Sequence, residues 1–157
     1  YVNSAISQVR VLARGLAPIG IEERGLIAAL EGLAKTTSSV FGIRCEFLGR
    51  LEALDAETGA QTQLYRIAQE AVHNAVRHGK ASRVTIALTE DETGKTLSIE
   101  DDGIGFDAAH APHAGMGLHI MRYRATMVNG DLAIESHPGE GTLVACFLRH
   151  AREMPTG

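Results

Sequence analysis

The sequence is poor in the features that mark several common classes of protein. Aromatic residues make up 4% of its 157 residues and tryptophan is absent, so it lacks the stacking platforms on which single-strand nucleic-acid binders hold bases. Its formal net charge of −4 does not favour binding to nucleic acid either. No apolar run approaches the roughly 18 residues that a membrane span needs. We therefore expect a globular domain that binds no nucleic acid.

Cysteine is also scarce. Cys45 and Cys146 both fall in apolar, strand-like runs, where an unpaired thiol behaves as a small buried hydrophobe. Two cysteines at this separation do not provide the ligands of a zinc site. We expect both thiols to be free and buried, as in a reducing compartment, and we therefore expect a cytoplasmic location. If the sequence is part of a longer chain, its composition does not decide whether that chain is anchored in the inner membrane.

Hydrophobic periodicity gives the order of the secondary-structure elements. Helical spacing predicts helices over residues 1–16, 26–39, 61–78 and 118–128. Alternating apolar positions predict strands over residues 40–48, 82–89, 95–101, 131–136 and 142–149. Residues 51–60 are expected to form a loop. Two pairs of these strands form hairpins, so we predict a mixed, largely antiparallel sheet with helices packed on one face, an α/β two-layer sandwich.

The length suits one domain with a short attachment. The helical pattern is already under way at the first residue, which is typical of a fragment of a longer chain. We predict that residues 1–18 are the end of a helix and a linker, that residues 19–150 form the main domain, and that residues 151–157 are a tail.

A row of polar residues lies along the predicted helix 61–78. Glu70, Asn74 and His78 recur every four residues, so they project from one side of the helix. Such a row is usually a solvated face. An acid, an amide and an imidazole in line would equally suit a Mg²⁺–triphosphate, because an Asn oxygen can ligate the metal beside phosphate oxygens. Arg77 and Lys80 could add positive charge there.

Two acids and two glycines follow the predicted strand 95–101. In Asp101-Asp102-Gly103-Ile104-Gly105, the glycines allow the backbone to come close to a flat ligand. A carboxylate fixed at such a turn can accept hydrogen bonds from an amino group, which suits an adenine better than a phosphate. A lone Asp-x-Gly-x-Gly is nevertheless more often only a turn.

Two further glycine motifs follow. Gly115-Met116-Gly117-Leu118 leads into a predicted helix, whose first amide groups would attract phosphate. The motif is neither a Walker A loop nor a Rossmann fingerprint, and a simple glycine start to a helix explains it equally well. Gly139-Glu140-Gly141-Thr142 opens the last predicted strand, and in isolation it indicates a hairpin turn.

The order of these four motifs along the chain is the specific signal. An E-x-x-x-N helix, a D-x-G-x-G turn, a G-x-G-L helix start and a G-x-G-T turn resemble the N, G1, G2 and final boxes of the gyrase/heat-shock chaperone/histidine kinase/MutL ATPase superfamily. The resemblance covers roughly Leu26 to Leu148. Within the superfamily, the chain is most similar to the ATP-binding catalytic domain of two-component sensor histidine kinases. This resemblance implies the Bergerat ATP-binding fold, with ATP and Mg²⁺ as cofactors.

The resemblance also implies a role for each matched position. Asn74 would ligate Mg²⁺, and Glu70 would orient a water or metal ligand and is the candidate base, so these two are the predicted catalytic residues. Asp101 would accept the adenine amino group. The other predicted ligand contacts are Gly103 and Gly105 at the base, His78, Lys80, Gly115, Gly117 and Leu118 at the phosphates, and Thr142 on the adenine side through water.

The segment between Phe106 and Gly115 is short and lacks the Phe-rich lid of many histidine kinases. It resembles the short-lid subfamily, whose partners are usually NarL/LuxR-type response regulators. Residues 107–114 carry few apolar anchors, so we expect this lid to be mobile without nucleotide. Gln8–Pro18 resembles the end of the second helix of a dimerisation hairpin, which implies that the full-length protein is a homodimer through its own dimerisation and phosphoacceptor helices.

The histidines show one departure from the family. The phosphoacceptor histidine of these kinases is normally followed by an acid, and none of the seven histidines here is. We expect His73 and His119 to be packing or surface residues. The prediction is therefore a kinase domain that transfers the γ-phosphoryl group of ATP to a histidine on a missing segment, for onward transfer to a response regulator.

Two alternatives stay open. An anti-sigma-factor serine kinase belongs to the same superfamily, but it normally has no remnant of a dimerisation hairpin ahead of the domain. A non-catalytic ATP-sensing module would bind ATP without transferring phosphate, and the presence of both Glu70 and Asn74 argues against it.

Overall fold

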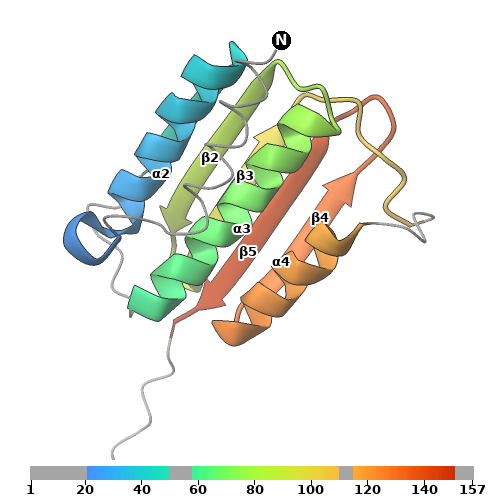
Figure 1. The fold of residues 1–157 in the computed structure, drawn as a ribbon. Coiled ribbons are helices and arrows are strands. Elements are labelled where there is room, and N and C mark those ends of the chain that lie inside the picture. The colour runs from blue at the N-terminus through green and yellow to red at the C-terminus, as the bar shows by residue number, and fades with distance from the viewer. Residues whose placement is uncertain (1–20, 50–57, 110–114, 151–157) are drawn as a thin grey trace, which may run out of the picture.

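The computed structural model describes residues 21–49, 58–109 and 115–150. The helices and strands in these ranges are drawn in Figure 1 and follow each other as α2 (Ile21–Phe41), β1 (Arg44–Gly49), α3 (Thr58–Arg77), β2 (Arg83–Glu90), β3 (Gly94–Asp101), α4 (Met116–Met127), β4 (Asp131–Ser136) and β5 (Thr142–Arg149). The predicted helix over 1–16, most of the predicted lid and the predicted tail lie outside the described residues.

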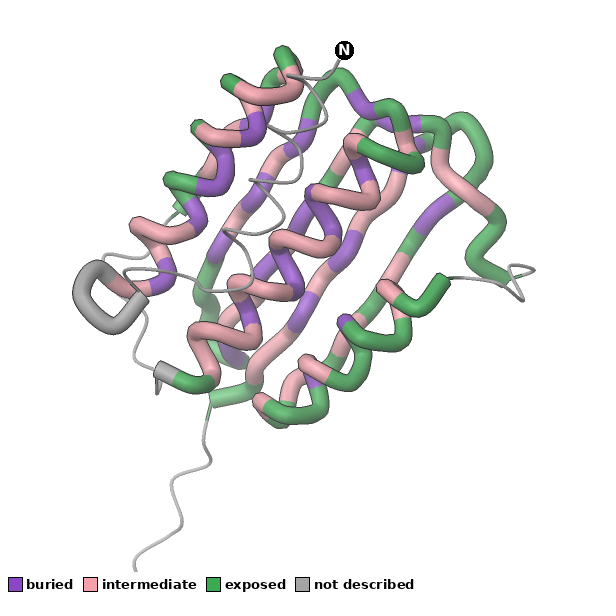
Figure 2. Tube along the Cα trace, in the orientation of Figure 1, coloured by how far each residue is buried: buried purple, intermediate pink, exposed green. Residues whose placement is uncertain are grey.

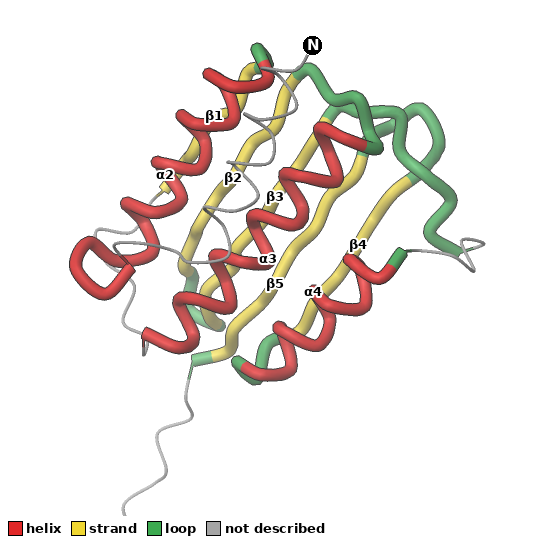
Figure 3. The backbone as a smooth tube through the Cα atoms, viewed as in Figure 1, coloured by secondary structure: helices red, strands yellow, loops and turns green. Residues whose placement is uncertain are grey.

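The described strands form one mixed sheet in the order β1-β2-β3-β5-β4. β1 pairs with β2 in parallel, and every other neighbouring pair is antiparallel. The helices all lie over the same face of the sheet, as Figures 1 and 3 show. The predicted two-layer α/β sandwich, with its two hairpins, is therefore confirmed.

The core lies between the sheet and the helices, and α3 contributes its centre. Leu64, Ile67 and Ala68 are fully buried, and they recur at the spacing of one helix face. Val84, Ile86 and Leu88 alternate along β2 and bury the facing side of the sheet. Figure 2 shows where the buried positions fall along the helices and strands. Burial of each such leucine, isoleucine or valine side chain stabilises the fold by roughly 1.5–3 kcal/mol.

Several predicted boundaries differ from the structure, and those of α2 and α3 show why. Val40 and Phe41 belong to α2, although the pattern placed them in the first strand. Their β-branched and aromatic side chains favour a strand in isolation, but the helix continues until Gly42, whose φ of 67° ends it. α3 begins at Thr58, whereas the pattern predicts a start at residue 61. The prediction is late because Gly59 and Ala60 carry no helical pattern of their own.

The expected state of the cysteines is confirmed. Cys45 on β1 and Cys146 on β5 are both free and buried. Burial raises the pKa of each thiol to about 11. In the part of the chain that the structure describes, no helix is long and apolar enough to cross a membrane.

Candidate functional site

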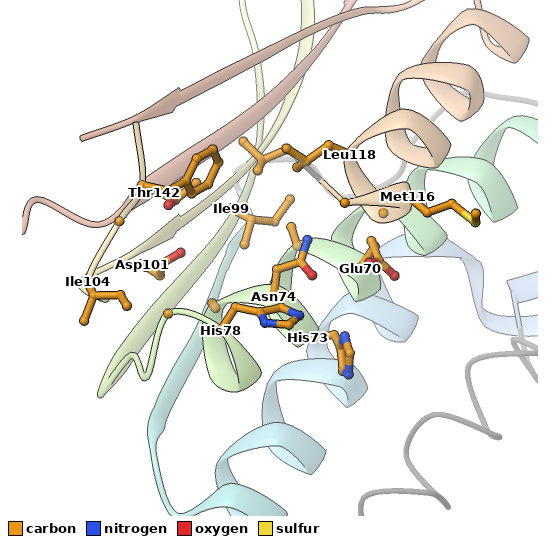
Figure 4. A pocket seen from close by; sticks show the side chains of 18 residues that line it. Glu70, His73, Asn74, His78, Ile99, Asp101, Ile104, Met116, Leu118 and Thr142 are labelled. Carbon is orange, nitrogen blue, oxygen red and sulfur yellow. The ribbon is translucent and has the colours of Figure 1, made fainter. Parts of the chain in front are cut away.

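A cavity of about 550 Å³ lies between the C-terminal half of α3, the ends of β3 and β5, and the first turn of α4. Its size is within the roughly 300–1,000 Å³ of small-molecule sites. Figure 4 shows Asp101, Ile104 and Thr142 at one end of it and Glu70 and Met116 at the other. The cavity therefore has two chemically different ends, formed by segments far apart in the sequence.

The structure gathers most of the predicted site residues around this cavity. The row on α3 is not merely a solvated face, because all three of its members line the cavity. The lining includes Glu70, Asn74, His78, Asp101, Gly105, Gly115, Gly117, Leu118 and Thr142. Gly103 and Lys80 are not among the lining residues: Gly103 is buried beneath the turn, and Lys80 is exposed where α3 leads into β2.

Asp101 supplies the polar group at the strand end of the cavity. Its Oδ1 accepts the N–H of Gly103 at 2.8 Å, and its carboxylate also accepts the backbone N–H of Thr142. Partial burial nonetheless raises the pKa of this carboxyl above its ordinary value. Ile99 and Val144 line the same part of the cavity. A fixed hydrogen-bond acceptor between apolar side chains suits a flat heteroaromatic ring that carries an amino group.

The neighbouring Asp102 serves the fold instead. Its Oδ1 accepts the N–H groups of Ser82 and Arg83, each at 2.8 Å, and its Oδ2 accepts the Ser82 hydroxyl at 2.7 Å. These hydrogen bonds hold the pKa of Asp102 below its usual value. The two adjacent acids therefore differ in role: Asp102 holds the start of β2 by hydrogen bonds, and Asp101 lines the cavity.

The turn after β3 is held by the backbone on both sides. The N–H of Ile104 donates to Gly79 O at 2.8 Å, and the carbonyl of Ile104 accepts the N–H of Gly139 at 2.6 Å. Gly105 has a φ of 64°, and a Cβ at this position would overlap the carbonyl oxygen of His137. Only glycine fits there, so the second glycine of the motif is required by close backbone packing.

The other end of the cavity combines a carboxylate with a helix start. Gly115 is the N-cap residue of α4 and makes no side-chain cap hydrogen bond, so the first amide groups of the helix can meet an anion. Gly117 packs directly against Glu70, and a Cβ at this position would overlap Glu70 Oε1. The glycine thus lets the carboxylate lie against the first turn of α4.

The sequence interpretation missed His73, which was expected only to pack or to lie on the surface. It lines the cavity, and its ring meets that of His78 edge-on, with centroids 6.5 Å apart. Burial is the largest cause that lowers the pKa of His73, with Arg77 and His78 acting in the same direction and Glu70 against it. The spacing to Glu70 could have revealed it, because residues three apart on a helix are neighbours.

The side-chain oxygens of Asn74 and Glu70 are suited to ligate a magnesium ion bound to a triphosphate. Across the described residues, no three His, Cys, Asp or Glu side chains gather in a way that could hold a metal. Mg²⁺ does not need three protein ligands, because it usually keeps several waters and takes one or two protein oxygens plus substrate phosphates. The amide oxygen of Asn74 and the carboxylate of Glu70, one helical turn apart beside the cavity, are oxygens of this kind.

A two-layer sandwich with such a cavity, polar at both ends, has the architecture of a small-molecule-binding domain. Residues 59–152 match the model of a family described as histidine kinase-, DNA gyrase B-, and HSP90-like ATPase. The match covers more than half of the 157 residues, and the chain belongs to this family of ATPases. Family membership implies the use of ATP.

Two curated relatives carry histidine-kinase names. The chain is 32% identical over 145 residues to the signal transduction histidine-protein kinase/phosphatase DegS of Brevibacillus brevis, which covers 91% of this chain and 37% of that protein. It is 35% identical over 155 residues to the sensor histidine kinase MctS of Rhizobium johnstonii, and the match covers 96% of this chain and 33% of that protein. The chain thus spans about a third of the length of these relatives.

Solved structures show the same fold. The histidine kinase domain of the blue-light activated histidine kinase from Erythrobacter litoralis EL346 superposes with a TM-score of 0.69 at 19% identity, over 92% of this chain and 74% of that one. The ATP binding domain of PrrB from Mycobacterium tuberculosis gives a TM-score of 0.62 at 20% identity, over 78% and 91%. The predicted Bergerat fold is confirmed.

Proposed function

We propose that this domain is the ATP-binding catalytic part of a sensor histidine kinase. One observation carries the proposal: a fixed carboxylate, Asp101, and a carboxylate–amide pair, Glu70 and Asn74, line the same cavity from different elements. The first would bind the base of ATP and the second would handle its phosphates. The histidine-kinase names of the two curated relatives support the same conclusion.

The chain's own residues would act mainly by positioning, which is the chief requirement of phosphoryl transfer. Asp101 would hold the adenine by accepting a hydrogen bond from its amino group. The Asn74 oxygen would hold Mg²⁺ beside the phosphates, where the ion supplies charge neutralisation. The amide groups of Gly115, Met116 and Gly117, at the start of α4, would contribute positive potential at the same end, whereas the N–H of Leu118 already donates to Gly115 O.

Glu70 is the candidate base in the transfer step. The incoming imidazole nitrogen forms a bond to the γ-phosphorus while the bond from that phosphorus to the β–γ bridging oxygen breaks and ADP leaves. The attacking nitrogen uses its lone pair, so the proton on the other imidazole nitrogen must go to an acceptor, and the Glu70 carboxylate lies at this end of the cavity. The phosphoryl group would then pass to an aspartate of a response regulator.

We further propose a NarL/LuxR-type response regulator as the partner, because the segment between Phe106 and Gly115 is too short for the longer lid type. The parent protein would dimerise through the hairpin to which residues 8–18 are assigned. A cytoplasmic location follows from this proposal, since both ATP and a response regulator are found there.

The decisive experiment for this function is a phosphorylation assay on the full-length parent chain with Mg²⁺ and ATP labelled in the γ-phosphoryl group. We expect label on a histidine that is followed by an acid, recognisable because its P–N bond is cleaved by acid. An acid-stable label on a serine of a partner protein would instead establish the serine-kinase alternative. ATP binding with no transfer at all would leave an ATP-sensing module and refute the kinase.

A further inference from the structure

Ser136, the last residue of β4, is a buried polar residue at the edge of the nucleotide cavity. Its side chain is almost completely buried, with 3% exposure. The hydroxyl oxygen lies 2.9 Å from the backbone nitrogen of Phe106, 3.1 Å from the carbonyl oxygen of Gly141 and 2.8 Å from the hydroxyl oxygen of Thr142. Phe106 and Thr142 both line the cavity. Ser136 therefore ties together two separate parts of its wall.

The chemistry of these three partners fixes the direction of each hydrogen bond. A serine hydroxyl has one proton to donate and lone pairs to accept with. The backbone N–H of Phe106 can only donate, and the carbonyl of Gly141 can only accept, so the proton of Ser136 goes to Gly141. The remaining bond must then run from the hydroxyl of Thr142 to Ser136. Thr142 is left with lone pairs alone to offer to the cavity.

Thr142 stands beside the predicted base contact. It is paired with Asp101 across β3 and β5, and its backbone N–H is bonded to the Asp101 carboxylate. Figure 4 shows both side chains at the same end of the cavity. With the hydroxyl of Thr142 committed to Ser136, this end presents two hydrogen-bond acceptors side by side.

We propose that Ser136 is a positioning residue that makes this pocket select a base carrying an amino group, by holding the Thr142 hydroxyl as an acceptor toward the cavity. The proposal rests on the proposed binding of ATP. A base with a carbonyl in place of the amino group brings an acceptor against two acceptors, and a site built for a donor discriminates against such an analogue. Without Ser136, the Thr142 hydroxyl is free to rotate and to donate to that carbonyl.

The test compares ATP with inosine triphosphate, which carries a carbonyl where ATP has the 6-amino group. Calorimetric titrations give the affinity for ATP divided by the affinity for inosine triphosphate, and this quotient is the ratio used below. For Ser136→Ala we expect this ratio to fall about fivefold, the effect of one hydrogen bond, through weaker binding of ATP and stronger binding of inosine triphosphate. Ser136→Thr keeps the hydroxyl and should keep the parent's ratio.

A matched control is available in α2. Thr37 is fully buried and its hydroxyl donates to Leu33 O at 2.7 Å, away from the residues that line the cavity. Thr37→Val therefore removes a comparable buried hydroxyl and should lower stability without changing the ratio. A change of the ratio in Thr37→Val as large as that in Ser136→Ala would reduce the role of Ser136 to general stability and overturn the proposal.

A second variant, at Thr142, keeps the proposal testable if Ser136→Ala folds poorly. Thr142→Val removes the hydroxyl on which Ser136 is proposed to act, so it should lower the ratio by itself. In that background Ser136→Ala should change the ratio no further. A parent-like ratio in Ser136→Ala or in Thr142→Val overturns the proposal while ATP binding stands. Absence of ATP binding by the parent would overturn the proposed function as well.

Discussion

The carboxylate of Glu70 on α3 occupies the space into which a side chain at position 117 on α4 would extend. The resemblance to the family assigns Gly117 to the phosphates. The structure adds a steric reason for a glycine at this position, because the Glu70 carboxylate could not keep its place beside a Cβ. The start of α4 and the candidate base are therefore coupled by direct contact.

This contact predicts the effect of Gly117→Ala in the full-length parent chain. The atom in the way is the end of a flexible side chain, so Glu70 should move aside at little cost, and the free energy of unfolding should change by less than about 1 kcal/mol. The displaced carboxylate should slow phosphoryl transfer about tenfold or more, as expected for loss of a positioned base. Single-turnover transfer rates and ATP affinities measure the two effects separately.

Gly59→Ala is the matched control for this variant, since a Cβ on Gly59 of α3 would meet nothing within 4 Å. It should leave the transfer rate unchanged. Glu70→Asp withdraws the carboxylate by one methylene, so we expect it to recover part of the rate in the Gly117→Ala background. Transfer at the parent rate in Gly117→Ala would show that the contact with Glu70 has no role in catalysis.

Asn74 should govern the response to magnesium. If its amide oxygen ligates Mg²⁺ beside the phosphates, Mg²⁺ should tighten ATP binding in the parent and should do so much less in Asn74→Ala, while affinity without Mg²⁺ changes little. Titrations of ATP at several Mg²⁺ concentrations measure this. Asn129→Gly serves as the control, because Asn129 has a positive φ of 53° that glycine adopts freely. An equal Mg²⁺ effect in Asn74→Ala and in the parent would remove Asn74 as the ligand.

The two thiols should be inert while the protein is folded. Their raised pKa of about 11 leaves very little thiolate near pH 8, and the thiolate is the reactive form. Burial also shields both sulfur atoms, with 8% exposure for Cys45 and 0% for Cys146. Alkylation followed by mass spectrometry should therefore be slow in buffer and fast in denaturant, with Cys146 the slower of the two. Equal labelling rates in both conditions would contradict this burial.

Much of the fold could be predicted from the sequence, because its signals are local and periodic. The alternation along β2 and the apolar stripe of α3 each identify an element without knowledge of the rest. Val40 and Phe41 were misassigned because their intrinsic preference for strands was overridden by the continuation of α2. The start of α3 was missed because Gly59 gives no helical signal.

The residues at the cavity likewise include some that the sequence could predict and others that it could not. Glu70, Asn74 and Asp101 could be found because each belongs to a motif with a fixed spacing. Ser136 could not, because a serine between a strand and a turn is common, and its importance lies in three hydrogen bonds to groups that only the fold brings together. His73 was missed because it belongs to none of the four motifs, although its position three residues after Glu70 places it beside the row that lines the cavity.

We propose that Asp101 recognises the base of a nucleotide bound in this cavity, and the neighbouring Asp102 provides the control. In Asp101→Asn the single amide oxygen is taken by the N–H groups that now bond the carboxylate, those of Gly103 and Thr142, so an NH₂ replaces an acceptor. Asp102→Asn keeps an acceptor oxygen for Ser82 and Arg83, outside the cavity.

Calorimetric titration of both variants with Mg-ATP, alongside the parent and with circular dichroism to verify folding, is the most direct measurement. We expect no detectable binding by Asp101→Asn and binding of parent strength by Asp102→Asn, with native spectra for both. Undiminished binding of ATP by a folded Asp101→Asn would contradict this role of Asp101.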